Sequence, residues 1–179
     1  MEGNVKVLIP EEKVKEKIQE IGERINADYA GKELHVICIL KGGVFFMCEL
    51  VKHITVPVTH DFMSVSSYGD GTVSTGRIKL IKDLDESIEG KDVLIVEDIL
   101  DTGRTLHHLI QLLHTRNPKS IRLCTLLDKP DRRVIDVPVD YVGFSIPDLF
   151  VVGYGLDYAQ HYRNLPYIGV VDVEDEKEI

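Results

Sequence analysis

Residues 93–105 read VLIVEDILDTGRT, and this stretch decides the fold. Its first four residues are apolar and rich in β-branched side chains, which predicts a strand buried on both faces in the middle of a parallel sheet. Glu97 and Asp98 follow at once. We expect them at or just past the carboxyl end of that strand, where unpaired carboxylates need solvent, a cation or ligand hydroxyls. The stretch therefore brings negative charge to one edge of a sheet.

The next segment, residues 101–105 (DTGRT), is made of small and hydroxyl-bearing residues and leads into a helix. That helix is predicted by apolar residues at helical spacing, Leu106, Leu109, Ile110 and Leu113. A helix N-terminus offers free N–H donors and the positive end of a dipole, and Gly103 lets the backbone approach an anion closely, so the loop is a candidate phosphate cradle. The alternative is that Asp101 or Thr102 simply caps the helix.

The glycine spacing removes the best support for two common kinds of nucleotide site. The loop has neither the GxxxxGK[ST] pattern of nucleoside triphosphatases nor the GxGxxG pattern of dinucleotide-binding proteins. Carboxylates beside a phosphate cradle point instead to a phosphorylated sugar, whose ribose hydroxyls the acids would reach directly or through a hard divalent cation.

Residues 96–105 (VEDILDTGRT) resemble the phosphoribosyl-pyrophosphate-binding motif of the phosphoribosyltransferases, an apolar strand and two acids followed by D-[TS]-G-x-T. The rest of the chain resembles the hypoxanthine-guanine branch of that family over nearly its whole length. The resemblance implies an α/β type I phosphoribosyltransferase fold, with a mainly parallel central sheet flanked by helices. It also implies a single domain over residues 1–179, with a small hood over the base site built from the N- and C-terminal segments.

The order of predicted elements independently favours an α/β fold with a mainly parallel sheet, whose ligand binds outside the carboxyl ends of the strands. Helical spacing predicts helices at residues 10–29 and 44–52. Apolar or alternating stretches predict further strands at residues 34–40, 57–65, 77–81, 120–127, 139–144 and 165–171.

Composition indicates an ordinary globular domain, with 179 residues of which 44% are hydrophobic and 28% charged. The net charge of −9 argues against general binding to nucleic acid or to an anionic membrane. Cys38, Cys48 and Cys124 lie in apolar stretches without CxxC spacing, which predicts reduced, buried thiols in a cytoplasmic protein. We expect neither a signal peptide nor a membrane span.

A second glycine loop, Lys41-Gly42-Gly43, follows the strand at residues 34–40. Read alone, it is either an anion site or a tight turn with a surface lysine. The resemblance implies that Lys41 and Gly42 bind pyrophosphate, with a non-proline cis peptide bond between Leu40 and Lys41. It further implies that Arg163 contacts the same pyrophosphate.

The resemblance changes the interpretation of three regions. Residues 66–76 would ordinarily be a surface loop, but they resemble the family's mobile lid, with its Ser-Tyr pair at Ser67 and Tyr68. Lys129 would ordinarily be a solvated lysine, whereas the resemblance makes it the purine contact. Phe150 and Val151, otherwise core residues, would stack on the base and contact its edge.

The resemblance implies purine salvage: a Mg²⁺-dependent transfer of phosphoribosyl to hypoxanthine or guanine, giving IMP or GMP and pyrophosphate. The 5′-phosphate site would comprise Asp101, Thr102, Gly103, Arg104 and Thr105. Asp101 would double as catalytic base, and the acids on the ribose and metal side would be Glu97, Asp98 and Asp157. The substrates would be small molecules, and the family is commonly a homodimer or homotetramer.

Two rival functions remain open at this point. A regulator with this fold could bind a nucleotide or RNA without turnover, although an RNA binder should have a basic face and this chain is acidic. A transferase for a pyrimidine, adenine or xanthine is the other rival. Lys129 with Phe150 and Val151 favours a 6-oxopurine without ranking hypoxanthine, guanine and xanthine.

Overall fold

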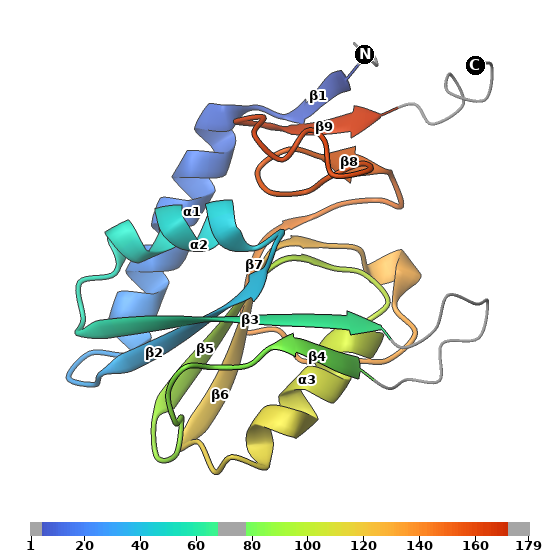
Figure 1. The fold of residues 1–179 in the computed structure, drawn as a ribbon. Helices are drawn as coiled ribbons and strands as arrows, with labels where there is room; N and C mark the ends of the chain where they lie inside the picture. Colours follow the sequence, from blue (N-terminus) through green and yellow to red (C-terminus); the bar gives the residue numbers. More distant parts are fainter. Residues whose placement is uncertain (1–4, 68–77, 172–179) are drawn as a thin grey trace.

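A twisted sheet runs through the middle of the molecule, with helices on both faces and a smaller sheet at one end (Figure 1). The computed structural model describes residues 5–67 and 78–171. Within them the central sheet has the strand order β4-β3-β2-β5-β6-β7. Its strands are β2 (Leu34–Leu40), β3 (Val58–Ser67), β4 (Ile78–Lys82), β5 (Asp92–Leu100), β6 (Ser120–Asp128) and β7 (Tyr141–Ser145). Every neighbouring pair is parallel except β3 with β4, which confirms the predicted, mainly parallel sheet.

The strands β2 and β5 are buried on both faces because helices cover the sheet from both sides. Val36 and Cys38 pack in one core with α1 (Glu11–Asp28) and α2 (Val44–Leu50), which continues into a short 3₁₀ helix at Val51–His53. Ile37 and Ile39 point the other way, into a second core with α3 (Arg104–His114). The alternation of faces along each strand produces these two cores. No helix in the described part of the chain is both long and apolar enough to cross a bilayer.

The smaller sheet joins the two ends of the described chain. Its strand order is β1-β9-β8, with β1 (Val5–Ile9), β8 (Val151–Val152) and β9 (Ile168–Val171), and both pairings are antiparallel. The strand β1 was not expected from the sequence, because the consecutive apolar residues Val7 and Leu8 break the alternation that would mark an inward face. In the structure both side chains are exposed. Pairing with β9, far away in the chain, makes this segment a strand.

Two expectations are corrected by the structure. The strand β5 continues four residues past Val96 to Leu100, because its pairing with β6 runs on to Leu100 opposite Asp128. Glu97 and Asp98 therefore lie within the strand and not after it. Cys48 is exposed, while Cys38 and Cys124 are buried and all three thiols are free. The apolar neighbours of Cys48 turn inward along α2, whereas Cys48 shares the outer face with Phe45.

Candidate active site

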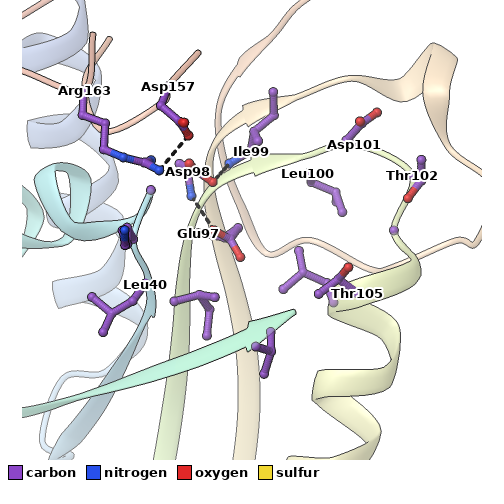
Figure 2. Close-up of a pocket in the computed structure, with 16 residues that line it drawn as sticks. Leu40, Glu97, Asp98, Ile99, Leu100, Asp101, Thr102, Thr105, Asp157 and Arg163 are labelled. Atoms are coloured by element: carbon purple, nitrogen blue, oxygen red, sulfur yellow. Dashed lines mark hydrogen bonds and ion pairs between the residues drawn. The ribbon is translucent and has the colours of Figure 1, made fainter. Parts of the chain in front are cut away.

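A cavity of about 330 Å³ opens at the carboxyl edge of the central sheet (Figure 2). Its walls come from the end of β2, from β5 with the loop to α3, and from the segment between β8 and β9. Most of the predicted site residues line it: Lys41, Gly42, Glu97, Asp98, Asp101, Thr102, Gly103, Thr105, Asp157 and Arg163. Residues predicted from separate motifs, as far apart in the chain as Lys41 and Arg163, thus line one cavity.

The predicted phosphate cradle has the expected form of strand, loop and helix. Gly103 precedes α3 with a φ of +80°, in the left-handed region that glycine adopts without cost. The Oγ1 of Thr102 accepts a hydrogen bond from the backbone N–H of Arg104 at 3.4 Å, as in a Ser/Thr turn ahead of the helix. Thr105 lines the cavity from the first turn of α3, whereas Arg104 does not line it. Gly103 is the N-cap residue and no side chain caps α3, so neither Asp101 nor Thr102 caps the helix, and the loop keeps its N–H donors for a ligand.

A second segment supports the cradle from behind, and sequence reasoning missed it. The backbone N–H groups of Val134 and Ile135 both donate to the carbonyl oxygen of Thr102, each at 3.0 Å. The Nε of Arg133 donates to the carbonyl oxygen of Asp101 at 3.0 Å, and its Nη2 pairs with the Asp128 carboxylate. No motif marks these residues, because their role depends on which segment packs beneath the loop.

The side chain of Asp101 lies at the border of the cavity, beside a cation. The Nε of Arg132 lies 2.9 Å from Oδ1 of Asp101. That oxygen is shielded from water and accepts no hydrogen bond within the described residues, so the contact is ionic in character. Arg132 also lies 3.4 Å from Oδ1 of Asp148. The Asp101 carboxylate therefore keeps lone pairs that could accept hydrogen bonds from a ligand in the cavity.

The acid pair Glu97 and Asp98 faces the centre of the cavity (Figure 2). The backbone N–H of Asp98 donates to Oε1 of Glu97 at 3.1 Å, and the N–H of Ile99 donates to Oδ1 of Asp98 at 2.8 Å. Burial, together with the charge of Asp98, raises the pKa of Glu97 well above its usual value. Adjacent, half-buried carboxylates of this kind favour a positive or hydrogen-bond-donating ligand.

The glycine loop after β2 approaches the acid pair closely. The peptide bond between Leu40 and Lys41 is cis, as the family resemblance implied. A Cβ on Gly42 would lie 1.6 Å from Oδ2 of Asp98, so any larger residue would displace that carboxylate. The exposed Lys41 reaches across to Oε1 of Gln160 at 3.1 Å. The backbone of Gly42 therefore packs on the Asp98 carboxylate, while the adjacent Lys41 is positioned by Gln160.

Arg163 is fixed by three contacts within the segment between β8 and β9. Its Nη2 lies 2.7 Å from Oδ1 of Asp157, and its Nη1 donates to the carbonyl oxygen of Gly155 at 2.7 Å. Gly155, with φ +101°, packs so tightly that a Cβ would lie 2.0 Å from the carbonyl oxygen of Gly42. In the third contact, Nη2 of Arg163 donates to Oε1 of Gln160 at 3.4 Å. Gly155 and Gln160 were not predicted, although the GYG run at residues 153–155 is a usable signal.

The residues expected to bind the purine do not line this cavity. Lys129 is only 8% exposed, and its Nζ lies 3.6 Å from Oδ1 of Asp148. Val151 is buried in β8, whereas Phe150 is 44% exposed and meets the ring of Tyr158 edge to face. The backbone N–H of Lys129 donates to the carbonyl oxygen of Leu100, which does line the cavity. The lysine thus neighbours the cavity through its backbone.

The acids do not form a complete metal cage. Within the described residues no group of three acidic, histidine or cysteine side chains converges as a metal site would require. Asp157 is instead engaged with Arg163 and with the N–H of Gln160. Mg²⁺ needs only one or two carboxylates when substrate phosphates and water complete its shell. Glu97 and Asp98 fit that requirement, and Asp157 fits it less well. The expected lid residue Tyr68, with most of residues 66–76, lies outside the described residues.

A protein-family model identifies the family to which this chain belongs. The family model "Phosphoribosyl transferase domain" matches residues 8–159. The chain therefore belongs to the phosphoribosyltransferases, the class defined by its sheet, its cradle and its acid pair.

Close relatives narrow this class. The chain is 53% identical over 178 residues to the hypoxanthine phosphoribosyltransferase of Salmonella typhimurium, covering 98% of this chain and 100% of that protein. It is 54% identical over 166 residues to the hypoxanthine-guanine phosphoribosyltransferase of Bacillus subtilis, covering 93% and 92%.

Solved structures agree. A hypoxanthine-guanine phosphoribosyltransferase from Bacillus anthracis superposes with a TM-score of 0.90 at 51% identity, covering 93% of this chain and 98% of that one. A hypoxanthine phosphoribosyltransferase from Staphylococcus aureus gives 0.92 at 52% identity, covering 96% and 93%. Within its family the chain is a transferase of the hypoxanthine-guanine branch.

Proposed function

We propose that this enzyme transfers the phosphoribosyl group of 5-phosphoribosyl 1-pyrophosphate to hypoxanthine and to guanine, giving IMP or GMP and pyrophosphate. The observation that carries the proposal is the meeting, around one cavity of about 330 Å³, of a phosphate cradle, an acid pair and the cations Lys41 and Arg163. These are the groups that a phosphorylated, pyrophosphorylated ribose would need. The branch to which the chain belongs supports purine salvage as the setting.

The cradle and the acids would hold the sugar phosphate. Backbone donors of residues 101–105, with the hydroxyls of Thr102 and Thr105, are proposed to bind the 5′-phosphate at the N-terminus of α3. Glu97 and Asp98 are proposed to accept hydrogen bonds from the ribose hydroxyls. This fixes ribose carbon 1 between the purine and the departing pyrophosphate, so that alignment supplies much of the rate.

The reaction would place positive charge on the ribose as the pyrophosphate leaves. Lys41 and Arg163 are proposed to stabilise the charge of the leaving pyrophosphate, which they can do because both line the cavity. Asp101 is proposed to accept the proton from the purine 7-nitrogen, and its place in the wall of the cavity supports that role. The ion pair with Arg132 would hold the Asp101 side chain in place beside the cavity.

The purine is proposed to bind beside this cavity, under the small sheet that would serve as the hood. Phe150 is exposed enough to stack on a base, and the backbone of Val151 lies next to it in β8. Lys129 is proposed to donate to the 6-oxo group, exchanging Asp148 for the base. Lysine would meet the amino group of adenine as one donor facing another, which disfavours that base.

Mg²⁺ is proposed as the cofactor, with Glu97 and Asp98 as the residues that would hold it. Bound there, the ion would neutralise the pyrophosphate and the two half-buried carboxylates. The proximity of these acids supports the assignment, since burial and mutual repulsion disfavour their ionisation when no cation is near. We also propose a cytoplasmic homodimer or homotetramer, which light scattering would test.

A direct assay tests the proposed reaction. The protein is incubated with phosphoribosyl pyrophosphate, Mg²⁺ and each of hypoxanthine, guanine, xanthine and adenine, and nucleotide formation is followed by chromatography. We expect IMP and GMP, with adenine inert, and no product when EDTA replaces Mg²⁺. Product from adenine alone would overturn the purine assignment, and full activity in EDTA would overturn the metal assignment.

A further inference from the structure

A second cavity lies at the opposite edge of the central sheet, and the proposed reaction assigns no role to it. It has a volume of about 380 Å³. Its walls include Gly31 and His35 around the start of β2, Thr59 at the start of β3, and Gly90 and Asp92 around the start of β5. Small-molecule sites occupy about 300–1,000 Å³. The cavity is therefore large enough for a ligand of its own.

Lysines surround the mouth of this cavity in a chain that is acidic overall. Lys32, Lys91 and Lys119 line it, with Glu33 and Asp92 as the acids among its described lining residues. The chain carries a net charge of −9, so a local gathering of ammonium groups makes this region unlike the average surface. The lining favours an anionic ligand if its acids are already neutralised.

The carboxylate of Asp92 is neutralised within the structure. Lys119 Nζ lies 2.9 Å from its Oδ2, and the hydroxyl of Ser120 donates to its Oδ1 at 2.6 Å. The Ser120 hydrogen bond and the Lys119 ammonium lower the pKa of Asp92, so the carboxylate remains ionised and paired at neutral pH. Glu33 is on the exposed surface, where solvent screens its charge.

The remaining lysines are held only weakly by other groups. Lys91 Nζ lies 3.1 Å from Glu86, whose side chain is 70% exposed. Exposed ion pairs contribute about 0–1 kcal/mol, so this ammonium can turn to an incoming anion at little cost. Lys32 donates to the carbonyl oxygen of Asp28 at 3.3 Å and lies over the ring of Tyr29. Neither lysine is committed to a buried carboxylate.

His35 forms part of the buried wall of this cavity and places a spectroscopic reporter beside it. It lines the cavity and is 3% exposed, and its Nδ1 lies 2.8 Å from Oγ1 of Thr59. Its Nε2 is buried and has no hydrogen-bond partner within the described residues. Buried polar atoms without partners are rare. Nε2 is shielded even though the cavity is open, so the imidazole forms part of the cavity wall without offering its Nε2 to a ligand.

We propose that this cavity binds an oxyanion of the phosphate class, with Lys32 and Lys91 supplying positive charge and the imidazole of His35 forming part of the wall. Inorganic phosphate and a small phosphorylated metabolite share this chemistry, and the cavity has room for either. The site is separate from the proposed active site, so it stands whether or not the proposed reaction is correct.

NMR of the full-length protein labelled with ¹⁵N at histidine tests the proposal, with the His35 signals assigned from the spectrum of His35→Gln. Inorganic phosphate is titrated at constant ionic strength, with chloride as the matched anion, and ribose 5-phosphate is the second probe. The variants are Lys91→Met and Lys32→Met, each checked for an unchanged melting temperature. Lys79→Met on β4 is the control for a lysine elsewhere on the surface, and Lys41→Met is the control for the substrate cavity.

We expect a saturable shift of the His35 signals with phosphate but not with chloride. Its dissociation constant should rise about fivefold or more in Lys91→Met and in Lys32→Met, and stay unchanged in Lys79→Met and Lys41→Met. Tighter binding of ribose 5-phosphate than of phosphate would identify a metabolite as the ligand, and the reverse would identify the free anion. Unmoved His35 signals, an equal response to chloride, or a response lost only in Lys41→Met would overturn the proposal.

Discussion

Replacing Gly103 by alanine tests whether the support beneath the phosphate cradle matters for both stability and binding. Gly103 has a φ of +80°, and a Cβ there would lie 2.2 Å from the carbonyl oxygen of Ile135. The left-handed conformation costs an alanine about 1–2 kcal/mol. The backbone carbonyl must also retreat to about the 3.4 Å of ordinary contact, and such overpacking costs a further 1–3 kcal/mol or so.

Gly90 provides a matched control, since its φ is +70° and a Cβ there would meet nothing within 4 Å. Gly90→Ala should therefore carry only the conformational cost, partly offset by the lower entropy of its unfolded chain. For a chain of this size about 1 kcal/mol lowers the melting temperature by roughly 2–4 °C. We expect a loss of that size for Gly90→Ala and roughly 5–15 °C for Gly103→Ala.

The functional readout separates cradle geometry from general stability. A displacement of about 1 Å in a substrate-positioning loop can cost on the order of 10²-fold in rate. We expect kcat/KM for phosphoribosyl pyrophosphate to fall at least about tenfold in Gly103→Ala, measured well below its melting temperature, and to stay within about twofold in Gly90→Ala. Equal melting temperatures and equal kcat/KM in the two variants would refute the reasoning.

Three further predictions concern single side chains. Asp101→Asn should melt within about 1 kcal/mol of the parent, since it loses only an exposed ion pair with Arg132, yet lower the single-turnover rate by roughly 10²–10⁴, and a parental rate would exclude Asp101 as the proton acceptor. Lys129→Ala should raise KM for hypoxanthine far more than KM for phosphoribosyl pyrophosphate, and equal changes would contradict its role in base selection. Although burial opposes ionisation, backbone N–H donors from Phe62 and Asp85 lower the pKa of Asp61. Its stabilisation is thus present above the unfolded-state pKa of about 3.9 and is lost as pH falls through the lower folded-state pKa. Melting curves should show a shallower acid loss in Asp61→Asn, and identical acid profiles would contradict this.

Local patterns determined the central unit of the fold. The run VLIV, the acids Glu97 and Asp98, and the glycine at 103 predicted strand, loop and helix, because each signal lies within one short segment. Strand and helix alternation then predicted the parallel sheet and its ligand-binding edge. The cis peptide at Leu40 came only from the family resemblance, and the structure confirms it.

Tertiary packing decided what no single segment encodes. The strand β1 exists because β9 pairs with it, and Cys48 is exposed because α2 turns its other face inward. The hydrogen bonds from residues 133–135 to the cradle depend on which segment lies beneath Gly103.

The acid pair shows the division most clearly. Sequence alone predicted two carboxylates at the end of a strand. Only the folded chain brings Gly42 and Arg163 to them, from segments about 55 and 65 residues away. Steric contact and charge interactions depend on separation in space, which the order of residues along the chain does not reveal.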